Sequence, residues 1–300
     1  MPLFFPLYFW RLYKWLLRLL TRKCELLRIC EGTADLASRT FAVARSLKNS
    51  KHKELQSIAW VTPAGQDVID PDDALNLIIK TKKISTEKHP NFVSSIKPCL
   101  LPIIALSALK GDIEKMKFES YLSENDEHEQ QLTKLWSLLV PQTELKARFG
   151  THWGTIGFQG KDPATDFRGM GMLGLYCLVY FAEMHSGKAR QVLGFSQHPT
   201  KGYPLAITSI NITQIVYSLL LNSHLDYYLY LKSRGNVPTI NDFMEAHCYV
   251  MYSFNQFWLD SNPENIMAFS RVRDRYLSEL KRRLEERPLT IELSLEDGSS

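Results

Sequence analysis

Apolar residues at helical spacing constrain the fold of this chain more than any other feature. In residues 126–140 they recur at three- and four-residue steps, which places them on one face of a helix: Leu132, Leu135, Trp136 and Leu139. No stretch alternates in the way that strands joined by hairpin turns would. Helical signals also mark further segments, which are residues 71–83, 204–223, 239–260 and 263–286. The sequence therefore predicts an all-α fold.

Helix-capping residues set the expected starts of the last two helices. Thr239 precedes one apolar pattern, and Asn262-Pro263 precedes the last, heavily charged one. Threonine and asparagine cap helix N-termini, and proline favours the first helical turn. We therefore expect helices to begin at both positions.

Composition and charge are those of an ordinary globular protein. Hydrophobic residues make up 45% and charged residues 23% of the 300 residues, as in typical folded domains. The formal net charge of +4 is too small for the strongly basic face of a nucleic-acid-binding protein, so we expect no nucleic-acid partner. The five cysteines and eight histidines show no metal-site spacing. Free thiols in a reducing compartment and no bound metal are expected.

The helical patterns group into one domain with an N-terminal appendage. We expect four segments, namely an N-terminal amphipathic helix (1–30), a helical part that packs on the core (31–124), the core itself (125–286) and a flexible tail (287–300). No internal repeat divides the chain. The sequence thus predicts a single all-α domain.

The N-terminus is apolar enough to suggest a membrane-spanning helix, but Arg11, Lys14 and Arg18 interrupt it. Each basic residue near a bilayer centre costs about 2.5–3.5 kcal/mol. With Arg22 they form one stripe on a helix, beside aromatic and aliphatic bulk, which is typical of a helix lying in a membrane interface. Packing on the protein, a cleaved presequence and a spanning segment are the alternatives. We expect residues 1–22 to place a cytoplasmic protein peripherally on an intracellular membrane.

Residues 151–183 contain the densest cluster of special residues. Asp162, Pro163 and Asp166 predict a rigid, polar turn. A strongly apolar segment begins at about Met172. We therefore expect a buried helix to follow the turn directly.

Arg168 lies at the junction between this turn and the buried helix. Gly169 and Gly171 follow it, and both are expected to allow tight backbone geometry. A long cation at such a junction is held at its base and can project outward. From these residues alone, an ion pair with Asp162 or Asp166 is the alternative to a chemical role.

Two nucleotide-binding signatures are incomplete in this segment. Gly169-x-Gly171-x-x-Gly174 matches the dinucleotide fingerprint, but no hydrophobic strand precedes it and no acidic residue follows at the required distance. A Gly-Lys pair resembles a P-loop, but Asp162 stands where serine or threonine must hold magnesium. We therefore expect no bound nucleotide and no cofactor in this chain.

The central segment resembles the signature of the ELMO domain. The positions that carry the likeness include Trp153, Gly157, Phe158, Gln159, Asp162, Pro163, Asp166, Phe167, Arg168, Gly169 and Gly171. The Lys23–Leu26 segment and the hydrophobic start further resemble the ELMO-domain-containing (ELMOD) proteins. The likeness extends from about residue 8 to residue 280.

The resemblance implies an activator of GTP hydrolysis by Arf and Arf-like small GTPases, with Arg168 as the catalytic group. Such a protein is not itself an enzyme, because it supplies one residue to a GTPase in its GTP-bound state. An arginine from a partner raises the rate of GTP hydrolysis by about 10³ to 10⁵. Its planar, permanently charged fork fits phosphate oxygens better than lysine does.

The other motif residues are expected to support the loop or to bind the GTPase. Gln159 has a structural role or orients water and switch loops, and Trp153 and Phe167 belong to the core or to a docking rim. The alternative function is a non-catalytic scaffold, because the larger ELMO proteins use this domain beside an exchange factor for Rac. Those proteins need helical repeats before the domain and a membrane-reading domain after it. The 300 residues leave no room for either, so we favour the activator.

Overall fold

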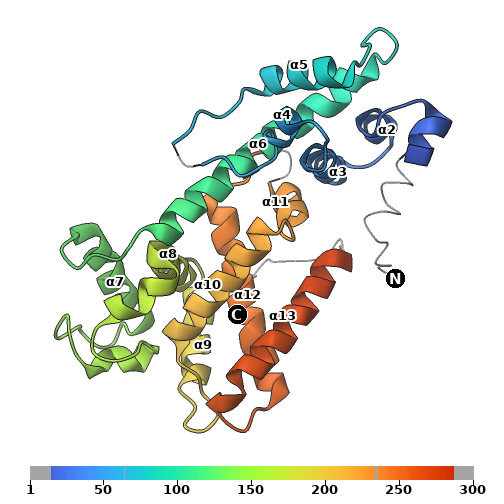
Figure 1. Ribbon diagram of the computed structural model, residues 1–300. Helices are drawn as coiled ribbons and strands as arrows, with labels where there is room; N and C mark the ends of the chain where they lie inside the picture. The colour runs from blue at the N-terminus through green and yellow to red at the C-terminus, as the bar shows by residue number, and fades with distance from the viewer. Residues whose placement is uncertain (1–14, 64, 234–235, 287–300) are drawn as a thin grey trace. The chain divides into compact units, whose positions relative to one another are not determined.

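The computed structural model describes residues 15–63, 65–233 and 236–286 (Figure 1). Every regular element within these ranges is a helix, which confirms the all-α fold. The chain forms two compact units. The first contains residues up to Gly111 together with Asp226–Pro238, and the second contains Asp112–Leu225 and the residues from Thr239 onward. The second unit thus begins before residue 125, the expected start of the core.

The first unit is built from short helices and most of one long helix. Its elements are α2 (Glu25–Glu31), α3 (Leu36–Lys48), α4 (Lys53–Gln56), α5 (Pro71–Lys82), α6 (Asn91–Phe118) up to Gly111, and α11 (Asp226–Lys232). Helix α5 confirms the expected helix at residues 71–83. The Asp70 side chain accepts from the Asp72 N–H at its start, and Lys83 adopts a left-handed conformation at its end.

The long helix α6 was not among the expected elements. It contains Pro98 and Pro102, and proline inside a helix removes a backbone hydrogen bond, so the sequence pattern does not predict one continuous helix. By length and hydropathy α6 could cross a membrane. However, 56% of its most apolar window is buried inside the protein, as in the core helix of a globular protein.

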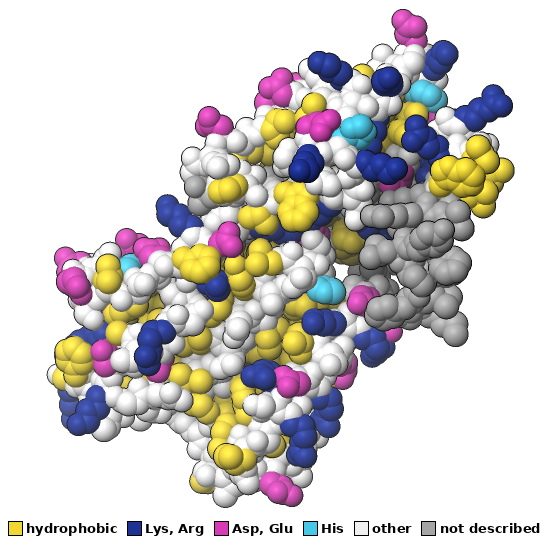
Figure 2. All heavy atoms as spheres, viewed as in Figure 1, with side chains coloured by type: hydrophobic (Ala, Val, Ile, Leu, Met, Phe, Trp, Pro, Cys, Tyr) yellow, Lys and Arg dark blue, Asp and Glu magenta, His cyan; other side chains and the backbone are white. Residues whose placement is uncertain are grey.

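The N-terminal segment is described only from residue 15. Residues 15–21 are helical, and four large apolar side chains on them are exposed, namely Trp15, Leu16, Leu19 and Leu20. Figure 2 shows hydrophobic side chains gathered on this helix. The expected amphipathic helix over residues 1–30 is therefore not continuous, because residues 22–24 are not helical and a separate helix, α2, follows at Glu25–Glu31. Residues 1–14 of it lie outside the described residues, as does the expected tail from residue 287.

Ion pairs around the buried Asp226 connect three helices of the first unit, namely α3, α6 and α11. The Lys110 Nζ lies 2.6 Å from Oδ1 of Asp226, and the Lys48 Nζ lies 2.8 Å from Oδ2. Lys110 and Asp226 are each only 2% exposed. Burial lowers the pKa of Lys110 to about 8 even though Asp226 opposes the shift. Burial alone would raise the pKa of Asp226, but the two lysines hold it below its usual value.

Helix α8 (Gly171–Met184) lies among the other helices of the second unit (Figure 1) and packs against α7, α9, α10 and α12. The remaining elements are α7 (Asp126–Leu139), η1 (Thr151–Ile156), η2 (Pro163–Gly169), α9 (Ser186–Ser196), α10 (Leu205–Leu221), α12 (Ile240–Ser261), η3 (Ile266–Ala268) and α13 (Phe269–Glu286). Most side chains of α8 and α10 are buried. The expected buried helices after the turn and at residues 204–223 are therefore confirmed.

One of the two expected helix starts is wrong. Thr239 caps α12 in a capping box with Asp242, as expected. Asn262, in contrast, ends α12 in a left-handed conformation with φ 43°, and α13 begins only at Phe269. Asparagine adopts this conformation at helix C-termini, and proline commonly follows because it cannot continue the helix. Asn262-Pro263 thus marks the end of α12 rather than the start of α13.

The five cysteines are free thiols, and four of them are buried. The expectation of free thiols is confirmed, and the reducing compartment stays a prediction.

The buried charges of the first unit generate a stability prediction. Asp226→Asn leaves two lysines without their carboxylate, and we expect it to lower the free energy of unfolding by about 3–5 kcal/mol. Lys110→Met is the matched variant, because it keeps the pair between Lys48 and Asp226 and should cost less. Urea unfolding followed by circular dichroism measures both. Equal losses of unfolding free energy in the two variants, or no loss in Asp226→Asn, would contradict the stabilising role of Asp226 between the two lysines.

Candidate functional site

The loop that carries Arg168 consists of two short 3-10 helices, η1 and η2, within the second unit. Asp162 caps η2 by accepting from the N–H of Ala164 at 3.1 Å, and Pro163 occupies the first helical position. Proline suits that position because its fixed φ is already helical. The expected rigid turn is therefore a capped turn of helix.

Gly171 fixes the junction between η2 and α8. Its φ is 52°, and an added Cβ would lie 2.4 Å from the carbonyl oxygens of Lys117 and Glu119. The next N–H, that of Met172, donates to the carbonyl of Glu119 at 2.9 Å. Only glycine fits this close backbone contact, which confirms its expected role.

The other two motif glycines differ from each other. Gly157 has φ 85°, and an added Cβ would lie 2.1 Å from the backbone nitrogen of Leu205, so glycine is required there. Gly169 has no atom within 4 Å of an added Cβ and no positive φ. The expectation of tight geometry at Gly169 is therefore wrong.

A row of buried aromatic rings lies beneath the loop. Ring centroids are 5.4 Å apart between Trp136 and Trp153, and 5.9 Å apart between Trp153 and Phe158. The row continues from Phe158 to Phe167 at 5.5 Å, and Phe167 stacks on Tyr121 at 5.4 Å. Trp153 and Phe167 are almost completely buried. They therefore belong to the core and not to a docking rim.

Arg168 follows Phe167 directly, and its side chain is exposed. Its Nε donates to the carbonyl of Thr165 at 2.8 Å. Among the described residues, no carboxylate lies within 4.0 Å of the guanidinium and no hydrogen bond involves its terminal nitrogens. The loop thus holds the base of the group and leaves its outer edge open.

The two acidic residues considered as partners of Arg168 bind elsewhere. Oδ1 of Asp162 lies 3.0 Å from Nη1 of Arg148, and Asp166 accepts from the backbone N–H of Gln159 at 2.8 Å. Burial raises the pKa of Asp166, although this hydrogen bond and the nearby charge of Arg168 oppose the shift. Both carboxylates therefore shape the loop backbone. The side chain of Gln159 is exposed, and the hydrogen bond to Asp166 uses its backbone.

Arg148 is a site residue that the sequence did not reveal. Its Nε lies 2.6 Å from Oε2 of Glu129 in α7, so the guanidinium links this helix to Asp162 at the start of η2. It also lies over the rings of Tyr121 and Phe149, at 5.8 and 4.9 Å from their centroids. Glu129, Asp162 and Tyr121 come from separate segments, and no local pattern around Arg148 indicates that they meet.

Comparisons with known proteins place this geometry in a family. The model of the ELMO/CED-12 family matches residues 111–273, which include the whole loop and α8. The chain is 40% identical to ELMO domain-containing protein 1 of Mus musculus over 305 aligned residues, covering 96% of this chain and 92% of that protein. It is 43% identical to ELMO domain-containing protein 2 of Homo sapiens, covering 93% of each.

The similarity extends to a distant organism. ELMO domain-containing protein B of Dictyostelium discoideum is 35% identical over 280 aligned residues, which cover 90% of this chain and 93% of that protein. Both the family model, which spans more than half of the chain, and these nearly full-length relatives agree with the resemblance of the central motif. This chain belongs to the ELMO/CED-12 family and is an ELMO-domain-containing protein.

Proposed function

We propose that this protein activates GTP hydrolysis by small GTPases of the Arf family, with Arg168 as an arginine finger. The single observation that carries the proposal is the state of this side chain. Its guanidinium is exposed, is held at Nε by the carbonyl of Thr165, and has no carboxylate within ion-pair distance among the described residues. A cation used only for structure would be expected to have such a partner.

The chemistry of GTP hydrolysis explains why this arrangement is useful. Negative charge spreads over the oxygens of the transferring phosphoryl group, and a bare small GTPase stabilises it poorly. The free edge of a guanidinium presents two parallel N–H donors to such oxygens. The hydrogen bond from Nε limits the freedom of the side chain before the GTPase binds. The activator itself needs no cofactor, since magnesium and GTP belong to the GTPase.

Exposed apolar side chains lie on the segments that support the loop. Phe118 is 68% exposed and Leu122 is 48% exposed. They flank the backbone that contacts Gly171 and the Tyr121 ring that stacks on Phe167. Exposed apolar surface next to a functional loop is available to a partner protein. We infer that the GTPase docks over this segment when Arg168 reaches its nucleotide.

We further propose that the N-terminal helix binds an intracellular membrane surface, which would place the activator beside membrane-bound GTPases. The exposed apolar side chains of residues 15–21 support this role, and Arg18 on the same helix is also exposed. Apolar insertion and attraction to anionic lipids together strengthen such binding.

The proposed function leads to three predictions, of which the first concerns Arg168. Arg168→Lys should lower the stimulated rate of single-turnover GTP hydrolysis by about 10³, because lysine cannot present two parallel donors. Folding should be unchanged, since the side chain is exposed. A panel of GTP-loaded Arf and Arf-like proteins provides the measurement, and Arg271→Lys on exposed α13 is the matched control. Full stimulation by Arg168→Lys would refute the arginine finger, whereas no stimulation of any GTPase in the panel by the wild-type protein would leave a non-catalytic scaffold.

The second prediction concerns docking. Phe118→Ser combined with Leu122→Ser should raise the KM for the GTP-loaded GTPase at least about tenfold, as expected for the loss of apolar anchors. The maximal rate should remain unchanged, because Arg168 is intact. Met267→Ser is the control, since Met267 is 87% exposed in η3, away from the loop in sequence. An unchanged KM in the double variant would exclude this docking surface.

The third prediction concerns membranes. Deletion of residues 1–22 should abolish cosedimentation with vesicles that contain anionic phospholipid and preserve stimulation of GTP hydrolysis in solution. Leu19→Glu combined with Leu20→Glu should release the full-length protein as well, because two charges oppose apolar insertion. Persistent vesicle binding by both variants would show that another surface binds the membrane.

A further inference from the structure

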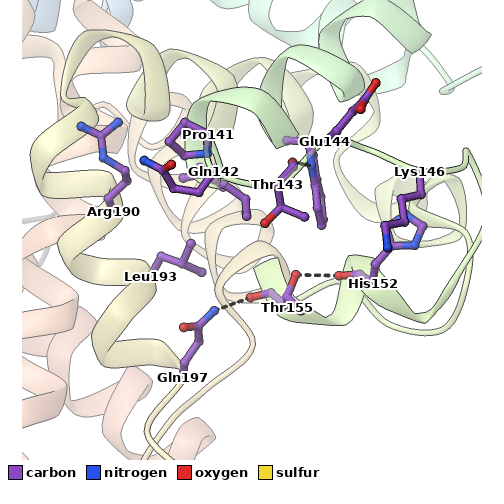
Figure 3. A pocket seen from close by; sticks show the side chains of 13 residues that line it. Pro141, Gln142, Thr143, Glu144, Lys146, His152, Thr155, Arg190, Leu193 and Gln197 are labelled. Carbon is purple, nitrogen blue, oxygen red and sulfur yellow. Dashed lines mark hydrogen bonds between the residues drawn. The ribbon is translucent and has the colours of Figure 1, made fainter.

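A pocket of about 850 Å³ opens between four elements of the second unit (Figure 3). The C-terminal end of α7 and the loop that follows it form one side, and η1 and α9 form the other. Pockets of about 300–1,000 Å³ suit small molecules. This one is separate from the exposed surface of Arg168, because neither Arg168 nor any other residue of η2 lines it.

Five of the side chains that line the pocket are apolar. They are Trp136, Leu139, Val140, Pro141 and Leu193. A wall of this kind favours the aliphatic part of a ligand, because burying it removes apolar surface from water.

The charged groups around the pocket are mainly cationic. Arg190 and Lys146 lie at opposite sides of it in Figure 3, and Glu144 is the one acidic residue in its lining. Arg190 donates to the carbonyl of Leu138 at 3.5 Å. Among the described residues, neither cation has a carboxylate within 4.0 Å. An anionic group entering the pocket would therefore meet available positive charge.

Hydrogen bonds hold the walls in place without a ligand. Gln197 Nε2 donates to the carbonyl of Thr155 at 2.9 Å, and Oγ1 of Thr155 donates to the carbonyl of His152 at 2.6 Å (Figure 3). On the facing side, Trp136 Nε1 donates to the carbonyl of Thr143 at 2.7 Å. A site that is already formed loses little entropy on binding.

The structure assigns to this pocket the binding of an anionic amphiphile, a compound with an alkyl chain and a carboxylate or phosphate group. Arg190 contacts the acid, and the alkyl chain lies against Leu139 and Leu193. This site is independent of the proposed GTPase activation, since neither its ligand nor its test involves a GTPase. Its wall shares Trp136 with the aromatic row, so an occupant would contact the support of the Arg168 loop.

Calorimetric titration of the full chain with sodium dodecanoate below its micelle concentration tests the assignment. We expect saturable binding at one site, and at least tenfold weaker binding of dodecanol and dodecylamine. Arg190→Glu should weaken dodecanoate binding at least tenfold, and Thr155→Trp should also weaken it, because the indole occupies part of the pocket. Arg271→Glu makes the same charge change on α13 and should alter the affinity less than twofold. Circular dichroism and the Tm confirm that each variant is folded.

Vesicles distinguish a free acid from a membrane lipid. Protein carrying Leu19→Glu and Leu20→Glu, in which the N-terminal helix should no longer bind membranes, is compared with and without Arg190→Glu for binding to phosphatidylcholine vesicles with and without phosphatidic acid. A loss confined to phosphatidic acid vesicles assigns the pocket to a lipid, whereas equal vesicle binding with impaired dodecanoate binding assigns it to a free acid. Absence of saturable dodecanoate binding, or binding that neither Arg190→Glu nor Thr155→Trp weakens, would overturn the assignment.

Discussion

The buried row of rings from Trp136 to Phe167 is the interaction on which the position of Arg168 depends. An exposed arginine on a loop would ordinarily sample many positions, and ordering it would cost free energy. Here the preceding residue, Phe167, is fixed between Phe158 and Tyr121. On the other side, Gly171 is pressed against the backbone of the α6 end. The exposed residue thus lies between two fixed points.

The acidic groups around the loop are bound to partners other than Arg168. Arg148 pairs with Asp162 and Glu129, and Asp166 holds the backbone of Gln159. Because these acids are already engaged, they shape the loop without occupying the guanidinium of Arg168. Lys48 and Lys110 of the first unit show the opposite case, in which both cations are paired with the buried Asp226.

The sequence was sufficient where one segment determines its own structure. The capped turn at Asp162-Pro163, the buried helix α8 and the need for glycine at position 171 all follow from local residue chemistry. It was insufficient where distant segments or competing signals decide. The two prolines inside α6 do not indicate a continuous helix. Asn262 is compatible with either the start or the end of a helix. Arg148 and the pocket beside Arg190 have no local sequence signal, because both depend on tertiary contacts.

In the proposed function, Arg168 stabilises charge on the transferring phosphoryl group rather than simply contacting a GTPase. The most direct measurement of this role is the affinity for an Arf-family GTPase loaded with GDP, with and without aluminium fluoride, which mimics that group in the transition state. We expect aluminium fluoride to tighten binding at least about tenfold for the wild-type protein, as transition-state mimics do. We also expect this gain to be lost in Arg168→Ala. An equal gain in affinity for Arg168→Ala would show that Arg168 does not stabilise the transferring phosphoryl group.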